Sequence, residues 1–241
     1  MAKQNQTQAQ PGRGLLCLSL AGQDAEALIL KAKPLIHLAD LVEIRLDSMQ
    51  KPDIAPFVQH FKVPILATNR PQWEGGGYRG SEEERLQVLE QAMAAGAAYV
   101  DIELRTEPGL RDALLAKAWQ RGIWALVSWH DFIATPDSPT LQNIITAMRG
   151  TTARSGKIVS TAATTADALR LLALLELAQQ ASFPLSAFAM GAPGGITRLA
   201  SLYLGGHISY ASLHETDATA SGQLSISRLR ALCNLFEKET A

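Results

Sequence analysis

One lysine stands out because of its position, near the start of the apolar run Gly156-Lys157-Ile158-Val159-Ser160-Thr161. The other seven lysines fall near the N-terminus, in helix-like segments or beside turns, where a solvated ammonium costs little. Apolar, β-branched neighbours would disfavour the charged form of Lys157, lower its pKa and leave a neutral amine able to attack a carbonyl carbon. Taken alone, the segment favours a plainer interpretation, a strand-end lysine whose ammonium reaches solvent.

His130 follows another apolar run, 123–128, within Ser128-Trp129-His130-Asp131-Phe132. In parallel α/β folds the carboxyl ends of the strands carry the site, so a histidine there is a candidate acid or base. A lone histidine elsewhere would more often be structural.

A loop with a glycine triplet, Gly75-Gly76-Gly77, follows the run 63–68 and also carries Arg70 and Glu74. Glycines let a ligand approach the backbone closely, while the arginine and glutamate offer an anion clamp and a carboxylate. A flexible surface loop explains the same residues equally well when the loop is taken alone.

Glu43, Arg45 and Asp47 stand at alternate positions in and after the run 41–46, which would point all three to one face of a strand. That face is either the wet side of an edge strand or a polar site in a barrel mouth. Arg198 follows a second glycine-rich turn, 191–195, which lacks the spacing of a P-loop or dinucleotide motif.

The elements that position these residues follow from a strict alternation of short apolar runs and helix-like segments. Asp24 predicts the start of one helix, and Ser81 with Glu84 forms the capping box of another. No repeat or shift of composition marks a boundary, so we predict an α/β fold, a single (β/α)8 TIM barrel over residues 15–241. The predicted strands are 15–20, 41–46, 63–68, 98–104, 123–128, 156–161, 185–190 and 207–212.

Such a barrel gathers the polar residues from six strands at one mouth, which favours a catalytic site over the plainer explanation of each residue alone. An amine near an imidazole suits a Schiff base with proton removal from the adjacent carbon. Arginines suit carboxylate recognition. The converging residues are Glu43, Arg45, Arg70, Glu74, His130, Lys157, Arg198 and Gln223.

Composition points to a small-molecule partner. A net charge of −1 and a pI near 6.5 provide no basic field for nucleic acid or anionic lipid. Cys17 and Cys233 lie in apolar patterns without metal-type spacing, which predicts core thiols in a reducing compartment. Residues 1–14 lack the apolar region of a signal peptide, and no stretch reaches membrane-spanning length. We expect a disordered tail over 1–14 and a cytoplasmic protein.

The sequence resembles the type I 3-dehydroquinate dehydratases of the shikimate pathway from about residue 15 to its end. Ser128-x-His130-Asp131-Phe132 with a lysine one strand later is the most specific part of the resemblance; the glycine turns are less specific. The other matching segments are Glu43-Ile44-Arg45-Leu46-Asp47, Arg70 with Glu74-Gly75-Gly76, Asp101-Ile102-Glu103, Met190-Gly191 to Arg198, and Gly222-Gln223.

The resemblance implies that Lys157 forms an imine with the C3 ketone of 3-dehydroquinate. His130 would remove the C2 proton and help the C1 hydroxyl leave as water, giving 3-dehydroshikimate, the third step toward chorismate and the aromatic amino acids. Glu74 would hold His130 and raise its basicity, and Arg198 would bind the substrate carboxylate. The residues implied for the substrate hydroxyls are Glu43, Arg45, Arg70 and Gln223, with Thr219 counted among the binding residues.

The resemblance implies neither a metal nor an organic cofactor. It also implies a homodimer, for which the segment 165–180, apolar nearly all round, is a candidate contact; a deeply buried helix is the alternative.

Two departures from the family's pattern affect the loop before Gln223 and the turn before Arg198. The family usually has Ser-Ala-Pro-Gly-Gln where this chain has Thr219-Ala220-Ser221-Gly222-Gln223, so the loop lacks a proline that would restrict it. Thr197 stands where serine is usual, a mild change.

Two other functions compete with this one. A class I aldolase or transaldolase-like lyase shares a strand-six lysine but binds a phosphorylated sugar, and no clear phosphate site follows the last two strands. A non-catalytic ligand-binding barrel is the other alternative, but such a protein would be expected to have lost at least one of these residues. Borohydride trapping of an imine separates both lyases from a binding barrel.

Overall fold

Eight strands alternate with eight α-helices in the computed structural model, which describes residues 13–217 and 222–239. The strands are β1 (Leu15–Leu20), β2 (Leu41–Arg45), β3 (Ile65–Thr68), β4 (Tyr99–Glu103), β5 (Trp124–Asp131), β6 (Ser155–Thr161), β7 (Leu185–Met190) and β8 (Ile208–Ala211). The α-helices are α1 (Ala25–Ala32), α2 (Ala55–His60), α3 (Glu82–Ala94), α4 (Pro108–Gln120), α5 (Ser138–Arg149), α6 (Thr165–Gln180), α7 (Thr197–Tyr203) and α8 (Ile226–Glu239). Four short 3-10 helices lie between them: η1 (Ile36–Leu38), η2 (Leu46–Ser48), η3 (Gln72–Glu74) and η4 (Glu215–Asp217).

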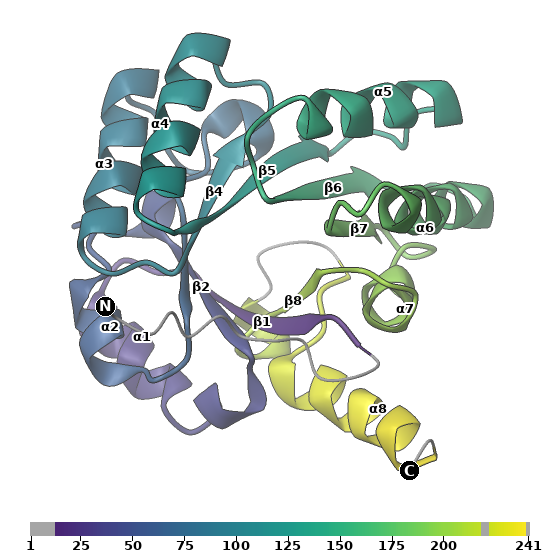
Figure 1. The fold of residues 1–241 in the computed structure, drawn as a ribbon. Coiled ribbons are helices and arrows are strands. Elements are labelled where there is room, and N and C mark those ends of the chain that lie inside the picture. The colour runs from purple at the N-terminus through teal and green to yellow at the C-terminus, as the bar shows by residue number, and fades with distance from the viewer. Residues whose placement is uncertain (1–12, 218–221, 240–241) are drawn as a thin grey trace.

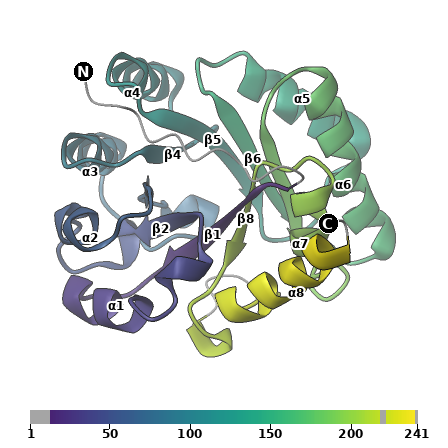
Figure 2. The same ribbon diagram turned by 60° about the horizontal axis from the view of Figure 1, so that its bottom comes forward.

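All strand pairs are parallel, in the order β7-β6-β5-β4-β3-β2-β1-β8, and the helices surround the strands (Figures 1 and 2). β7 and β8, the two ends of this strand order, are joined by single hydrogen bonds that close the barrel. The amide of His207 donates to the carbonyl of Leu185 at 2.9 Å, and the amide of Ile208 donates to Oγ of Ser186 at 3.0 Å. The predicted single (β/α)8 barrel is confirmed.

Alternate residues of each strand point into the barrel, and the inward set changes character along the strands. On β2, Leu41 belongs to the apolar interior and Glu43, two residues later, lines a polar pocket; on β4, Tyr99 belongs to the apolar interior and Asp101, two residues later, is a buried carboxylate. The apolar interior consists of Leu15, Cys17, Leu41, Leu66, Tyr99, Leu126, Val159, Phe188, Met190, Ile208 and Tyr210. Residues on the outward faces pack under the helices.

Local sequence signals explain where several elements begin. Asp24 accepts a hydrogen bond from the amide of Ala27, and Ser81 and Glu84 form the predicted capping box. Strand β5 extends three residues beyond the predicted end, because His130 pairs with Val159, and Asp131 pairs with Ser160, on β6. His130 therefore lies within the carboxyl end of the strand.

The chain packs against the barrel from Arg13 onward. Nη1 of Arg13 contacts Oδ2 of Asp40 at 2.7 Å, and Nε of Arg13 contacts Oε1 of Glu237 at 2.7 Å. The amide of Gly14 donates to the carbonyl of Leu202. Arg13 and Gly14, which the sequence groups with the tail, thus belong to the folded part, whereas residues 1–12 lie outside the described residues.

Helix α6 has apolar residues on both sides. Leu171, Leu174 and Leu175 are buried against the strands, while Leu169 and Leu177 keep 62% and 38% of their surface exposed. Cys17 and Cys233 are buried free thiols, as predicted. Over the described ranges, the chain contains no helix with the length and apolar character needed to span a membrane.

Candidate active site

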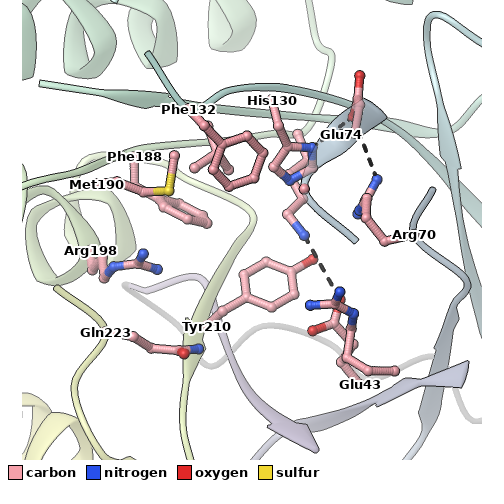
Figure 3. Close-up of a pocket in the computed structure, with 14 residues that line it drawn as sticks. Glu43, Arg70, Glu74, His130, Phe132, Phe188, Met190, Arg198, Tyr210 and Gln223 are labelled. Carbon is pink, nitrogen blue, oxygen red and sulfur yellow. Dashed lines mark hydrogen bonds and ion pairs between the residues drawn. The ribbon is translucent and has the colours of Figure 1, made fainter. Parts of the chain in front are cut away.

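A pocket opens at the carboxyl ends of the strands and encloses about 540 Å³, its open mouth included. Figure 3 shows Arg198 and Gln223 across this pocket from Glu74 and Arg70. The pocket brings together every predicted site residue except Thr219, which lies outside the described residues. Its lining is Glu43, Arg45, Arg70, Glu74, Gly75, His130, Phe132, Lys157, Val159, Phe188, Met190, Arg198, Tyr210 and Gln223.

Lys157 reaches the pocket from β6 and is 6% exposed. Its Nζ lies 3.5 Å from Oδ2 of Asp101 and 3.8 Å from Oε1 of Glu43, and 4.0 Å from the ring centre of Tyr210. The surroundings are therefore more acidic than the apolar run around this lysine indicates, because β2 and β4 contribute the carboxylates.

Two hydroxyl groups hold Glu43 in place. Oγ of Ser19 donates to Oε2 of Glu43, and Oγ1 of Thr68 donates to Oε1 at 2.9 Å. These donors sit on β1 and β3, on either side of β2, and the register pairs Ser19 directly with Glu43. Glu43 is thus part of a barrel mouth and not the wet face of an edge strand.

Arg70 is buried among carboxylates. Its guanidinium donates to Asp101, to Oε1 of Glu103 at 2.7 Å and to Oγ of Ser128 at 2.6 Å. Burial opposes ionisation of Asp101, but Arg70 and Lys157 outweigh it and hold the pKa of Asp101 below its usual value. Arg70 remains cationic, with a raised pKa, because these carboxylates outweigh its own burial.

Arg45 and Asp47 form a pair at the pocket edge. Strand β2 ends at Arg45, and Asp47 lies in η2, so the predicted common strand face covers only Glu43 and Arg45. Asp47 accepts from Nε and Nη2 of Arg45 at 2.9 and 2.6 Å, and from the backbone amides of Arg70 and Gly77. It thereby joins β2 to the loop after β3.

The glycine loop after β3 folds tightly on itself. Gly75 has φ = 75°, and a side chain there would meet the ring of Phe132; one at Gly76 would meet the carbonyl of Arg70. These glycines allow close packing within the protein, which is a different reason from the predicted approach of a ligand to the backbone. The fold of the loop places Glu74 inside the pocket wall.

His130 is held by Glu74. Its Nδ1 lies 2.8 Å from Oε2 of Glu74, and Phe132 stacks beside the imidazole with ring centres 6.1 Å apart (Figure 3). Burial, with the positive charges of Arg70 and Lys157, lowers the pKa of His130 well below its usual value. The expected rise in basicity is therefore not found, and the imidazole is neutral near pH 7.

Burial is also the largest influence on the pKa of the Glu74 carboxyl group. It raises the pKa of Glu74 to about 7, although the charges of Arg70 and Arg105 act in the opposite direction. When ionised, this carboxylate can accept the Nδ1 proton of His130 and leave Nε2 as the base. The pair therefore gains its working form as Glu74 ionises.

Arg198, 1% exposed, enters the pocket from the first turn of α7. Its Nε and Nη2 atoms are buried and have no hydrogen-bond partner among the described residues, and burial lowers its pKa to about 10. The preceding Thr197 fixes the turn, because its Oγ1 accepts from the amide of Ala189 and donates to the carbonyl of Gly194. Threonine thus supports the turn with its hydroxyl.

Two pocket residues, Tyr210 and Phe188, are not singled out from sequence, because they look like ordinary core residues of β8 and β7. Asp101 belongs to one of the matching segments, but its part in holding Arg70 and Lys157 is not predicted. The alternate polar positions of β4 were the available signal for Asp101. No group of three or more His, Cys, Asp or Glu side chains in residues 13–217 and 222–239 is arranged to hold a metal ion.

The arrangement suits a particular class of chemistry. An amine from β6 and a neutral imidazole from β5 share one face of adjacent strands, and the same pocket holds the guanidinium of Arg198, whose Nε and Nη2 have no hydrogen-bond partner among the described residues. Such a site can form an imine with a ketone, remove a proton from the carbon beside it and bind a carboxylate on the same molecule.

Known proteins share both the sequence and the fold. A family model described as Type I 3-dehydroquinase matches residues 16–240. A 3-dehydroquinate dehydratase of Desulfotalea psychrophila is 40% identical over 217 residues, covering 90% of this chain and 96% of that protein. One of Thermococcus gammatolerans is 39% identical, covering 83% and 89%.

Solved structures agree with these relatives. The 3-dehydroquinate dehydratase of Enterococcus faecalis superposes with a TM-score of 0.82 at 26% identity, covering 95% of this chain and 96% of that one. The type I enzyme of Clostridium difficile gives 0.83 at 22% identity, covering 95% and 94%, a likeness of fold.

Proposed function

The chain belongs to the type I 3-dehydroquinase family of hydro-lyases, and from this premise we propose that it dehydrates 3-dehydroquinate to 3-dehydroshikimate through a Schiff base on Lys157. The observation that carries the residue assignment is the placement of Lys157 and His130 on one face of adjacent strands, in a pocket that also holds Arg198.

The first step joins Lys157 to the substrate. The lone pair of Nζ attacks the C3 carbonyl carbon, and the resulting carbinolamine loses its hydroxyl as water to give a protonated imine. Asp101 and Glu43 stand 3.5 and 3.8 Å from Nζ. One of these carboxylates can accept the proton that the nitrogen releases, and both stabilise the cationic imine.

The second step removes water from the ring. His130 takes the proton from C2, and the electron pair of that C–H bond moves toward the imine nitrogen to form an enamine. The electrons then return to expel the C1 oxygen, which leaves as water with the proton from His130. Hydrolysis of the new imine consumes one water and frees Lys157, so the net loss is a single water.

The groups that bind the substrate can be inferred from which pocket side chains already have hydrogen-bond partners within the protein. Arg198, with its buried unpartnered donors, suits the substrate carboxylate. Glu43, Arg45 and Gln223 line the pocket and suit the ring hydroxyls. Thr219 belongs to this proposed set by the family resemblance. Arg70 was expected to contact a hydroxyl, but its bonds to carboxylates favour a role in fixing the site.

The same geometry argues against the two alternatives. An aldolase of phosphorylated sugars shares the strand-six lysine but does not need a histidine paired with this glutamate, and here Nδ1 of His130 lies 2.8 Å from Oε2 of Glu74. A binding barrel has no need for an amine flanked by two carboxylates and an imidazole bonded to a glutamate.

The remaining assignments extend the proposal to the cell. We place the reaction as the third step toward chorismate and the aromatic amino acids, in the cytoplasm, with no cofactor and no nucleic-acid partner. We also propose a homodimer, for which the exposed Leu169 and Leu177 on α6 provide an apolar contact face.

Imine trapping tests the proposed function directly. The protein is mixed with 3-dehydroquinate and borohydride, and Lys157→Met and Lys117→Met are treated in parallel; Lys117 is exposed and pairs with Glu90. We expect wild type and Lys117→Met to gain a substrate adduct that maps to Lys157 and to produce the enone absorbance of 3-dehydroshikimate. Lys157→Met should gain no adduct and lose at least about a thousandfold in kcat.

Absence of both adduct and enone in wild type would refute the dehydratase. An adduct formed with a sugar phosphate ketone, but not with 3-dehydroquinate, would instead indicate the aldolase.

A further inference from the structure

Arg105 lies just after β4 and contacts both members of the Glu74–His130 pair. Its Nε lies 2.8 Å from Oε1 of Glu74, and its Nη2 donates to the backbone carbonyl of His130 at 2.8 Å. Glu74 uses its other oxygen, Oε2, for Nδ1 of His130. One guanidinium thus ties the carboxylate to the strand end that carries the imidazole, from outside the pocket wall.

Two tryptophans hold this guanidinium. The Cζ atom of Arg105 lies 5.7 Å from the ring centre of Trp73 and 5.6 Å from that of Trp129. Trp73 immediately precedes Glu74, and Trp129 immediately precedes His130. Although 45% of the Arg105 side chain is exposed, the two rings limit its freedom and keep its donors directed at their acceptors.

The other charged groups around Glu74 cannot replace these contacts. Arg70 lies 3.7 Å from Oε2 and is committed to Asp101 and Glu103. Among the described residues, the one hydrogen bond to Oε1 of Glu74 comes from Nε of Arg105. Without it, the carboxylate could turn about its terminal bond and exchange the oxygen that faces His130.

We propose that Arg105 is a positioning residue for the dehydration: it fixes Glu74 and the backbone of His130 so that Nδ1 stays bonded and Nε2 stays directed to the substrate. The inference depends on the proposed function for its kinetic consequences. Arg105 does not touch the reacting atoms, since it lies outside the residues that line the pocket.

Charge supports the same role. Burial raises the pKa of Glu74 to about 7 and Glu103 adds to the rise, while Arg70 and Arg105 oppose it. Arg45, Arg70, Lys157 and Arg105 all act with burial to keep His130 neutral. Removing Arg105 therefore raises the pKa of Glu74 further, and the carboxylate that orients His130 forms only at higher pH.

Three variants separate positioning from simple packing. Arg105→Met removes the guanidinium but keeps an unbranched side chain, Arg105→Lys keeps the charge, and Arg154→Met is the matched control. Arg154 also stacks on two tryptophans, 5.0 Å from the ring centre of Trp119 and 5.6 Å from that of Trp124, but it precedes β6 at the far end of the barrel.

For Arg105→Met we expect kcat to fall about ten- to a hundredfold with KM within about threefold, because a charge-assisted bond in the catalytic pair is lost. The acid limb of the kcat/KM profile should move to higher pH by about one pH unit. Arg105→Lys should restore the limb while recovering only part of kcat, and Arg154→Met should match wild type. An Arg105→Met enzyme with wild-type kcat and pH profile would overturn the inference. A loss of activity with an unmoved acid limb would overturn it too.

A readout without substrate keeps this inference distinct from the proposed reaction. In ¹⁵N NMR, the His130 imidazole of wild type should hold its proton on Nδ1 as Glu74 ionises, and Arg105→Met should move that transition to higher pH. Arg154→Met should leave it unchanged. If the wild type neither dehydrates 3-dehydroquinate nor forms the adduct, the proposed function fails while this titration still decides the role of Arg105. An unchanged His130 titration in Arg105→Met would refute it.

Discussion

Nζ of Lys157 lies 4.0 Å from the centre of the Tyr210 ring. The aromatic face stabilises a cation at this point, and two carboxylates complete its surroundings. The hydroxyl of Tyr210 is buried without a hydrogen-bond partner among the described residues. The ring of this tyrosine therefore stabilises the cationic site, whereas its buried hydroxyl lowers the free energy of unfolding.

Tyr210→Phe should be more stable than wild type. The change keeps the aromatic face and removes a buried hydroxyl whose desolvation is uncompensated, so the free energy of unfolding should rise by about 1 kcal/mol. Activity should stay within about threefold. Urea unfolding and steady-state kinetics measure both quantities, with Tyr210→Leu as the variant that also removes the ring and lowers kcat. A clear loss of stability in Tyr210→Phe would mean that the hydroxyl is satisfied.

Arg198→Met should separate binding from stability. Loss of the carboxylate partner should raise KM about a hundredfold. The free energy of unfolding should remain equal or rise by about 1 kcal/mol, because the change removes a buried cation whose Nε and Nη2 have no partner in the described part of the chain.

The matched control is Arg85→Met, which removes another fully buried arginine, one bonded to Glu82, Glu103 and Thr106. This change should cost about 3 kcal/mol, because it leaves the buried Glu103 without one of its cationic partners. Equal losses of stability in the two variants, measured by urea unfolding, would contradict the assignment of Arg198 as the unpaired cation.

Glu74 gives the protein a defined dependence of stability on pH. Its pKa is about 7 in the folded state and about 4.3 in the unfolded chain, so the folded state binds more protons between these values. The raised pKa adds to the free energy of unfolding. This stabilisation is fully present below about pH 4 and is lost as pH rises through 7. Glu74→Gln lacks this titration.

Unfolding free energies of wild type and Glu74→Gln should therefore be compared from pH 4 to pH 7.5. The stability of wild type relative to the variant should fall by roughly 3 kcal/mol over this range. Contributions from the other carboxylates are common to both proteins and cancel. A difference that stays constant with pH would mean that Glu74 is ionised throughout.

The fold could be predicted because its signals are local. The bounds of α6 and β7 coincide with the prediction, since each is a continuous apolar segment between a clear start and a clear end. The predicted end of β5, at residue 128, falls three residues short of the observed end at Asp131. His130 and Asp131 are polar, and what keeps them in the strand is backbone pairing with β6, which side-chain patterns do not record.

The sequence predicts which residues form the site better than it predicts the groups that surround each of them. Lys157 is predicted from its apolar neighbours and His130 from its position at the carboxyl end of a strand, whereas the carboxylates beside Lys157 come from distant parts of the chain. Arg105 was missed for the same reason. It stands in what reads as an ordinary turn, and only the fold brings it to Glu74, 31 residues earlier.

The division of the barrel interior into an apolar part and a polar mouth has a consequence for how the protein can change over generations. Leu41 and Glu43, or Tyr99 and Asp101, are separated by one residue on the same strand, yet one fills the interior and the other serves the pocket. A library that randomises polar mouth positions such as Glu43 and Arg45, but spares the four residues that the pocket shares with the apolar interior, leaves the interior packing untouched. The four shared residues are Val159, Phe188, Met190 and Tyr210. New substrate preferences are therefore accessible to this scaffold without redesign of the residues that fill its centre.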